Sequence, residues 1–198
     1  MMARRGIELT YETVREWCGK FGPYFAEELR KKNRPKLGAK WFLDEVFLKI
    51  NGVQHYLWRA VDQHGAVIDI LVQPKRDRFA AIRFFRKLLR TTGRKPRVIV
   101  TDKLRSYGVA KRVVLSGVIH RQSRYLNNRA ENSHQPTRQR EKRMRRFKSP
   151  EQAQRFLSIF DPIATYFRTH RHRLSAARYR ALREKKFAMW DEVAHLNS

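Results

Sequence analysis

Two strand-like segments joined by Asn51-Gly52 constrain the fold of this chain more than any other feature of its sequence. Residues 40–50 and 53–62 have the composition and alternation of strands, and an Asn-Gly pair between them is the strongest short signal for a hairpin. A third strand-like segment, residues 66–73, follows the turn at residues 63–65. The sequence therefore predicts that three antiparallel strands begin the core.

An amphipathic helix, residues 78–93, separates these strands from a fourth one, the apolar run at residues 97–101. Asp77 is the expected cap of the helix and Gly93 its end. Because a strand, helix, strand connection is almost always right-handed, the fourth strand should run parallel to the third and the first. The predicted fold class is thus α/β, with a mixed sheet. The helix residues expected to face inward are Phe79, Ile82, Phe85, Leu88 and Leu89.

The remainder of the chain is predicted to be mostly helical. The segment at residues 104–115 indicates a helix, and residues 119–123 indicate a short fifth strand. Three further helices are expected within residues 128–147, 150–172 and 175–193.

Three carboxylates, those of Asp44, Asp102 and Glu131, stand where neither packing nor charge favours an acid. Asp102 is the single acid among the 53 residues from Arg78 to Ala130, which carry 15 Lys or Arg. Strand alternation puts Asp44 on the face of Phe42, Val46, Leu48 and Ile50. Burial of an unpaired carboxylate there would cost several kcal/mol, so we expect a cation, a donor or solvent beside it.

Topology gives these acids a reason to meet. If the fourth strand lies beside the first, Asp44 and Asp102 become neighbours, one in the middle of its strand and the other at the carboxyl end of the adjacent strand, where ligands commonly bind. The helix that carries Glu131 can lie across the sheet beside them. Three carboxylates would suit Mg²⁺, with Mn²⁺ as a substitute, and two such ions would support an in-line displacement at phosphorus.

Each acid also has an ordinary structural interpretation. Asp44 could pair with a buried arginine, Asp102 could cap the following helix, and Glu131 could lie in a solvated helical turn. The competing acids fit a metal site less well: Glu45 points to the opposite strand face, Asp62 precedes a turn, Asp77 caps a helix, and Asp69 is the least settled of them.

The charge of the chain favours a nucleic-acid partner. The formal net charge is +27, with 30 Arg against 15 Lys, and arginine suits bidentate contacts to phosphate and guanine. Residues 138–148 carry seven of these basic side chains, and Arg138 lies seven residues after Glu131. His134 is interpreted as a helix-face contact. The candidate DNA contacts in this half of the chain are Arg138, Lys142, Arg145, Arg129 and Lys103.

The N-terminal segment indicates part of a DNA-binding motif. Residues 10–21 predict a helix that begins after Thr10 and ends at Gly22-Pro23, and a second short helix runs to about Lys32. The pattern is similar to the turn and recognition helix of a helix-turn-helix, with Thr13 and Arg15 among the side chains free to contact DNA. An ordinary amphipathic helix fits as well. The expected domains are residues 1–34, 36–172 and 173–198.

Several classes of protein are disfavoured by what the sequence lacks. Cys18 is the only cysteine, so an internal disulfide and a cysteine-rich zinc site are excluded. There is no phosphate-binding glycine loop, and no secretory leader or membrane-spanning run. We expect a cytoplasmic protein.

Five segments together resemble the transposases of insertion sequences, specifically the DDE class and the family numbered six. These segments are WFLDEVF (41–47), YLWRAVD (56–62), IVTDKLRSYG (99–108), NNRAENSHQPTRQRE (127–141) and FKSPEQAQRFLSIF (147–160). The resemblance covers about residues 36–172 and is specific.

This resemblance implies an RNase H-like fold, with Asp44, Asp102 and Glu131 as the catalytic triad and Arg138 as the basic residue that follows. The implied reaction is nicking that frees 3′-OH ends, followed by their attack on target DNA. The implied partners are terminal inverted repeats, target DNA and further copies of the chain, on the DNA of a prokaryotic cell. Family members carry further helices before the turn, so we expect poor autonomous transposition. A structure-specific nuclease and a non-enzymatic nucleic-acid-binding protein remain alternatives.

Overall fold

A computed structural model describes residues 8–32, 37–123, 127–143, 147–167 and 174–195 of the chain. The chain divides into two compact units. One unit contains residues 35–161, and the other combines residues 1–34 with residues 162–198. Each unit is described by itself below.

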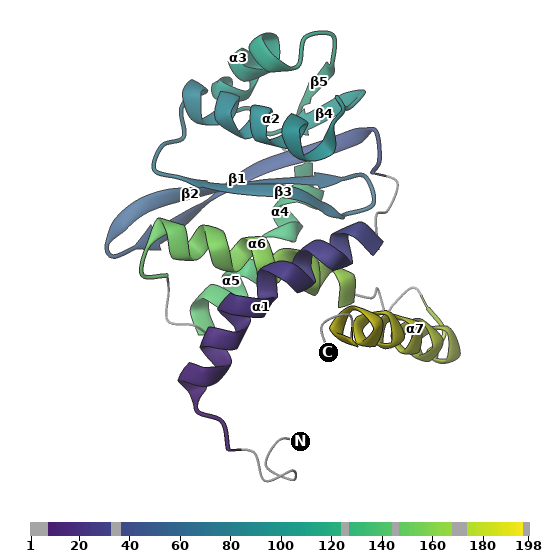
Figure 1. Ribbon diagram of the computed structural model, residues 1–198. Helices are drawn as coiled ribbons and strands as arrows, with labels where there is room; N and C mark the ends of the chain where they lie inside the picture. Colours follow the sequence, from purple (N-terminus) through teal and green to yellow (C-terminus); the bar gives the residue numbers. More distant parts are fainter. Residues whose placement is uncertain (1–7, 33–36, 124–126, 144–146, 168–173, 196–198) are drawn as a thin grey trace. The chain divides into compact units, whose positions relative to one another are not determined.

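The larger unit is built on a five-stranded sheet of order β3-β2-β1-β4-β5 (Figure 1). The antiparallel strands are β1 (Lys40–Ile50), β2 (Val53–Asp62) and β3 (Val67–Gln73). Strands β4 (Val98–Thr101) and β5 (Ile119–Gln122) continue the sheet in parallel with β1. This mixed sheet, flanked by helices, confirms the predicted α/β class and is RNase H-like in strand order.

The turn between β1 and β2 has the conformation that its sequence predicts. Asn51 and Gly52 have φ angles of 48° and 81°, so both residues adopt the positive φ of a type I′ hairpin turn. The register that follows pairs Asp44 with Arg59 and Leu48 with His55. Because the turn sets the register, it also decides which residues of β2 lie beside Asp44.

Helices cover both faces of the sheet (Figure 1). Helices α2 (Arg78–Thr92) and α3 (Arg105–Val114) pack on one face, against a core that includes Trp41, Leu43 and Trp58. Helices α4 (Asn128–Ser133) and α6 (Pro150–Phe167) lie over the other face. There, Ala130 packs with Phe42 and Val100, and Leu157 packs with Val46 and Leu48. Asp44 is therefore on the α4 and α6 side of β1.

Helix α2 begins and ends as predicted. The Asp77 side chain accepts a hydrogen bond from Ala80 N at 2.8 Å, and Gly93 ends the helix with a φ of 67°. The expected inward face was wrong at Phe79, which is 56% exposed. Ala81 and Phe84 are buried instead, which shifts the apolar stripe by about half a turn at its start.

The helix predicted for residues 128–147 is not continuous. It is divided at His134 into α4 and α5 (Gln135–Arg143). Pro136 explains the break, since its ring clashes with the preceding turn and it has no N–H to donate. Glu131 and Arg138 consequently lie on two different helices.

In the smaller unit, α1 (Tyr11–Lys32) is one helix where two were predicted. Pro23 lies inside it. Gly22 precedes this proline and has no Cβ to clash with its ring, so the helix continues. The half after Pro23 is stabilised by packing: Leu29 is buried with Tyr166 and Val193, and Phe25 contacts Trp190. The latter contact places Trp190 of α7 (Ala176–His195) within the monomer's own core.

The helix-turn-helix is not confirmed. Its expected turn falls mostly in residues 1–7, outside the described part of the chain. In the described part of α1, the apolar side chains of Val14, Trp17 and Phe21 are each more than 40% exposed.

Within the described ranges, no helix is both long enough and apolar enough to span a lipid bilayer.

The Asp77 cap can be tested by substitution. Asp77→Ala should lower the free energy of unfolding by about 1 kcal/mol, because Ala80 N then loses its acceptor. Asp77→Asn is the matched control and should retain most of the stability, since asparagine caps equally well. Urea unfolding of the three proteins measures both values, and equal losses for Ala and Asn would contradict the capping role.

Candidate active site

Asp44 is held near the middle of β1, on the face covered by α4 and α6. Its strand neighbours on that face, Phe42 and Val46, are buried, and its own side chain is 15% exposed. Directly across the hairpin lies Arg59 of β2. The carboxylate therefore has limited contact with solvent, as the strand pattern predicts.

Asp102 follows the last residue of β4. Its Oδ1 accepts a hydrogen bond from Leu104 N at 3.0 Å, so it stabilises the turn into α3. This bond belongs to the turn before α3 and is not the predicted helix cap, because the N-cap residue is Leu104 and no side chain caps the helix. Because β4 is parallel to β1 and adjacent to it, Asp102 lies at the carboxyl end of β4, beside the strand that carries Asp44.

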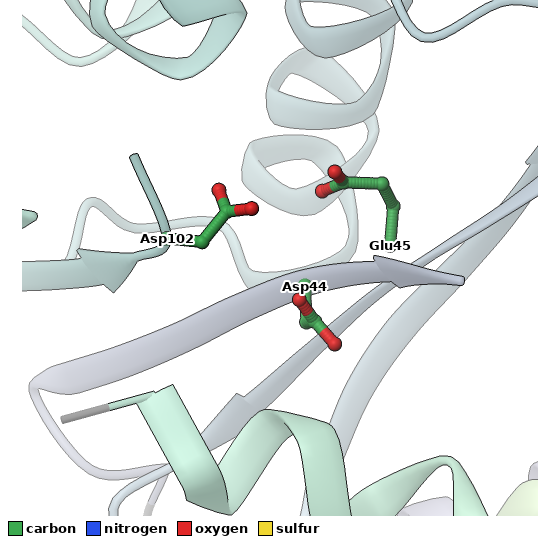
Figure 2. Close-up of side chains that lie close together, drawn as sticks. All are labelled: Asp44, Glu45 and Asp102. Carbon is green, nitrogen blue, oxygen red and sulfur yellow. The ribbon is translucent and has the colours of Figure 1, made fainter. Parts of the chain in front are cut away.

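A third carboxylate, that of Glu45, joins these two. One oxygen each from Asp44, Glu45 and Asp102 lies within 4.8 Å of the others. Figure 2 shows the carboxylates of Glu45 and Asp102 directed toward each other on one side of β1, with that of Asp44 on the other side. The alternation of side chains along the strand correctly predicted that Glu45 points to the face opposite Asp44. It was excluded from the candidate metal ligands on that ground, yet its carboxylate lies close to those of Asp44 and Asp102.

The extent of strand pairing explains how acids from both faces can meet. The register pairs β4 with β1 only over Lys40–Phe42, and β4 ends at Thr101. Beyond Phe42, β1 is no longer paired with β4, so the side chains of Asp44 and Glu45 can approach the end of β4 from opposite faces of β1. The alternation of residues along a strand predicts which face a side chain occupies, but it does not predict where a neighbouring strand ends.

The Glu45 carboxyl is buried and its affinity for a proton is altered. Tyr107 of α3 donates a hydrogen bond to its Oε2 at 2.6 Å, and Arg76 Nε lies 3.2 Å from its Oε1. Burial is the main cause that raises the pKa of Glu45, to about 7, against the lowering effect of the Tyr107 hydrogen bond. The charges of Asp102 and Asp44 raise it further. Glu45 therefore holds a proton below about pH 7 in the metal-free protein.

Glu131 is in α4, on the same side of the sheet as Asp44. Its side chain lies outside the described part of the structure. The backbone of α4 is anchored at its start by Asn127, whose Nδ2 donates to Leu43 O at 2.8 Å. Ala130, one residue before Glu131, is buried against Phe42 and Val100.

His134 adds an imidazole beside Asp44. Its Nε2 lies 3.5 Å from Asp44 Oδ2, and neither ring nitrogen makes a hydrogen bond within the described residues. Burial lowers the pKa of His134 well below its usual value, and the positive charges of Arg59 and Arg138 lower it further. This histidine is therefore neutral at pH 7. It was predicted as a helix-face contact, and it is a buried neighbour of the acidic cluster.

The other buried acids have structural partners. Asp62 accepts hydrogen bonds from the backbone N–H groups of Gly38, His64 and Ala66. Asp69 was the least settled acid, and it pairs with Lys87 and accepts from Thr91 Oγ1 at 2.6 Å. Neither belongs to the cluster around Asp44.

The predicted DNA contacts differ in how far the structure describes them. The side chains of Lys103, Arg138 and Lys142 are exposed. Arg15 is also exposed, and its guanidinium pairs with Glu12 at 2.6 Å. Thr13 is half-buried and hydrogen-bonded to Thr10. The Arg129 side chain and all of Arg145 lie outside the described part.

The donor set fits a hard divalent cation. Carboxylate oxygens from three residues converge, and a cation among them would offset their mutual repulsion, which adds to the effect of burial on the pKa of Glu45. Asp44, Glu45 and Asp102 could hold such an ion, and α4 brings Glu131 to the same side of the sheet. Carboxylates of this kind with divalent metal support phosphoryl-transfer chemistry.

Comparisons with known proteins agree on one family. Residues 38–170 match the sequence family DDE_Tnp_IS240, described as a DDE domain. The transposase for the insertion sequence-like element IS431mec of Staphylococcus aureus (strain Mu50) is 33% identical over 139 residues, which are 68% of this chain and 61% of that protein. The transposase for IS257 in transposon Tn4003 of Staphylococcus aureus is 34% identical over 135 residues, 66% and 59% of the two chains. This chain thus spans about three fifths of the length of the curated relatives it matches.

Among solved structures, the catalytic domain of Mos1 mariner transposase aligns with 94% of this chain and 94% of that domain. The sequence identity is 15% and the TM-score 0.45, a likeness too loose to support a conclusion.

The pKa of Glu45 predicts a pH dependence of stability in metal-free protein. The folded value, about 7, lies above the ordinary value of 4.5, so the folded state holds the extra proton between them. The free energy of unfolding should therefore fall as pH rises from 4.5 to 7, by roughly 3 kcal/mol from this group, and level off above. Glu45→Gln, which still accepts from Tyr107, should lack this fall.

Urea unfolding in EDTA between pH 5 and pH 8 measures the difference. Glu184→Gln, at an exposed position of α7, is the control and should follow the wild-type profile. Parallel profiles for wild type and Glu45→Gln would contradict the expected proton uptake.

Proposed function

Because the chain belongs to the DDE transposases of insertion sequence family six, we propose that it catalyses metal-dependent nicking of DNA and strand transfer at the ends of such an element. The proposal includes the freeing of 3′-OH ends and their joining to target DNA. The observation that supports it best is the approach of Asp44, near the middle of β1, to Asp102, at the carboxyl end of the parallel strand β4, inside the segment that matches the DDE domain.

In this proposal Asp44, Asp102 and Glu131 are the catalytic acids. Asp44 and Asp102 are supported by the distance between their carboxylates, and Glu131 by the position of α4 on the Asp44 face. Mg²⁺, as two ions, would supply activation of the attacking oxygen and stabilisation of the leaving one. The buried faces of β1 and β4 limit solvent around the acids, which strengthens their attraction for a cation.

We assign DNA contacts to basic residues near the acids. Lys103 directly follows Asp102, and Arg138 and Lys142 are exposed on α5, the helix next to α4. Arg129 and Arg145 belong to the same proposed surface by their sequence position. Lys and Arg side chains at these positions would neutralise phosphates and make binding depend on salt.

Recognition of the element's ends and assembly are also part of the proposal. The charge of +27 supports DNA as the partner, including terminal inverted repeats and target DNA. Thr13 and Arg15 of α1 are the candidate contacts to the repeats. A synapse of two ends would require further copies of this chain, and residues 36–172 are the proposed catalytic domain. The nucleoid is the corresponding site of action.

Substitution of the acids tests the proposal directly. Asp44→Asn, Asp102→Asn and Glu131→Gln should each reduce strand transfer by about a hundredfold or more, because a neutral amide is a poor ligand for a hard cation. Affinity for DNA should stay within about twofold, since phosphate contacts are elsewhere. The assay joins a duplex with a free 3′-OH to a supercoiled plasmid, in Mg²⁺ or Mn²⁺.

Asp69→Asn is the matched control, because Asp69 is also a buried strand acid but pairs with Lys87 and Thr91. It should lose stability and keep its activity per folded molecule. Cleavage without joining would favour a nuclease, and unchanged DNA chemistry in Asp44→Asn and Asp102→Asn would refute the assignment.

Lys142 tests the proposed DNA surface. Lys142→Ala should weaken binding to duplexes of any sequence and lower the slope of log K against log salt by about 1, the expected effect of one lost phosphate contact. Lys95→Ala is the control, because Lys95 is exposed just before β4, at the end of the strand opposite Asp102. Fluorescence anisotropy at several salt concentrations gives both slopes, and equal slopes for the two variants would contradict the surface.

A further inference from the structure

Arg59 is a buried cation beside the acidic cluster. Its side chain is 2% exposed, and in the hairpin register it is the direct partner of Asp44. A guanidinium buried to this extent must be paired and hydrogen-bonded, because it would otherwise be strongly destabilising. Its partners show what it holds in place.

The guanidinium of Arg59 reaches three helices on the Asp44 face. Its Nη1 donates to the backbone carbonyl of Ser133, the last residue of α4. Its Nη2 donates to Thr137 Oγ1 of α5 at 2.5 Å and to Asp161 Oδ2 of α6 at 2.7 Å. All three acceptors are buried. The planar fork of arginine suits such a set of acceptors, which a lysine could not reproduce.

These bonds fix the junction between α4 and α5 next to Asp44. Ser133, whose carbonyl accepts from Arg59, directly precedes His134, whose Nε2 lies 3.5 Å from Asp44 Oδ2. The other end of α4 is tied to β1 by the Asn127 hydrogen bond to Leu43 O. A helix of six residues has little stability of its own, so its place depends on these two attachments.

We propose that Arg59 is a positioning residue, which holds α4 against the sheet and so determines where Glu131 lies relative to Asp44 and Asp102. This inference rests on the proposed function of those acids. Arg59 does not touch the reacting groups in this role. Asp161 and Thr137 contribute to this positioning, because they hold the guanidinium of Arg59 in the orientation that reaches Ser133 O.

A role in stability alone makes a different prediction. A buried ion pair can often be replaced by apolar residues of similar volume without loss of stability. The double variant Arg59→Met with Asp161→Leu removes both charges together, so the fold should be retained. It makes no hydrogen bond to Ser133 O, so the position of α4 should not be retained.

The experiment measures Mn²⁺ affinity of the full chain by paramagnetic resonance, with urea unfolding of each variant alongside. We expect the double variant to bind Mn²⁺ about tenfold more weakly or worse, the usual effect of lost outer-shell support for a metal site. Strand transfer should fall with it. Wild-type Mn²⁺ affinity in a folded double variant would overturn the inference.

Thr137→Val provides a second test of the positioning role if the double variant does not fold. It removes one acceptor of Arg59 with little change in volume, and it should weaken Mn²⁺ binding. The matched control is Thr91→Val, which removes a hydrogen bond to Asp69 on the α2 side and should leave Mn²⁺ affinity unchanged. Equal affinity for Thr137→Val and wild type would refute the positioning role.

Asp44→Asn separates this failure from a failure of the proposed function. If wild type binds Mn²⁺ and Asp44→Asn does not, the metal site is supported and the Arg59 variants decide the inference. If Mn²⁺ binding does not depend on Asp44, the proposed function is contradicted, and the inference with it.

Discussion

The short parallel pairing of β4 with β1 is the constraint on which the candidate active site depends. The register joins the two strands over Lys40–Phe42, and β4 ends one residue before Asp102. A carboxylate is costly to bury without a donor or a cation, and a fully paired sheet would impose that cost on Asp44. Because the pairing stops early, acids from β1 and from the end of β4 can meet, including acids from both faces of β1.

The acids of the larger unit differ in which charged and polar groups surround them. Asp62 is surrounded by backbone donors, Asp69 by Lys87 and Thr91, and Asp161 by the guanidinium of Arg59. The carboxyl of Glu45 also has donors, Tyr107 and Arg76, but it lies beside two further carboxylates, and burial raises its pKa to about 7. The chain has a net charge of +27, so most of its surface would repel a cation. The three grouped carboxylates give a cation a site where it is attracted.

Much of the fold could be predicted because its signals are local. Asn51-Gly52 has the φ angles of a hairpin turn, and Asp77 caps α2. Predictions failed where packing competes with a local signal. Pro23 does not end α1, because Gly22 relieves the steric clash and the following turns are buried in the core of the smaller unit.

The sequence by itself determined the order of strands and helices and marked Asp44 and Asp102 as acids out of place, because periodicity, turn residues and charge are properties of neighbours along the chain. Only the tertiary structure decided that Glu45 joins them and that Arg59 pairs with Asp161. Glu45 joins them through the end of β4, and Arg59 meets residues 74, 78 and 102 positions away in sequence. Contacts of such long range depend on where strands end and helices pack, which no local pattern encodes.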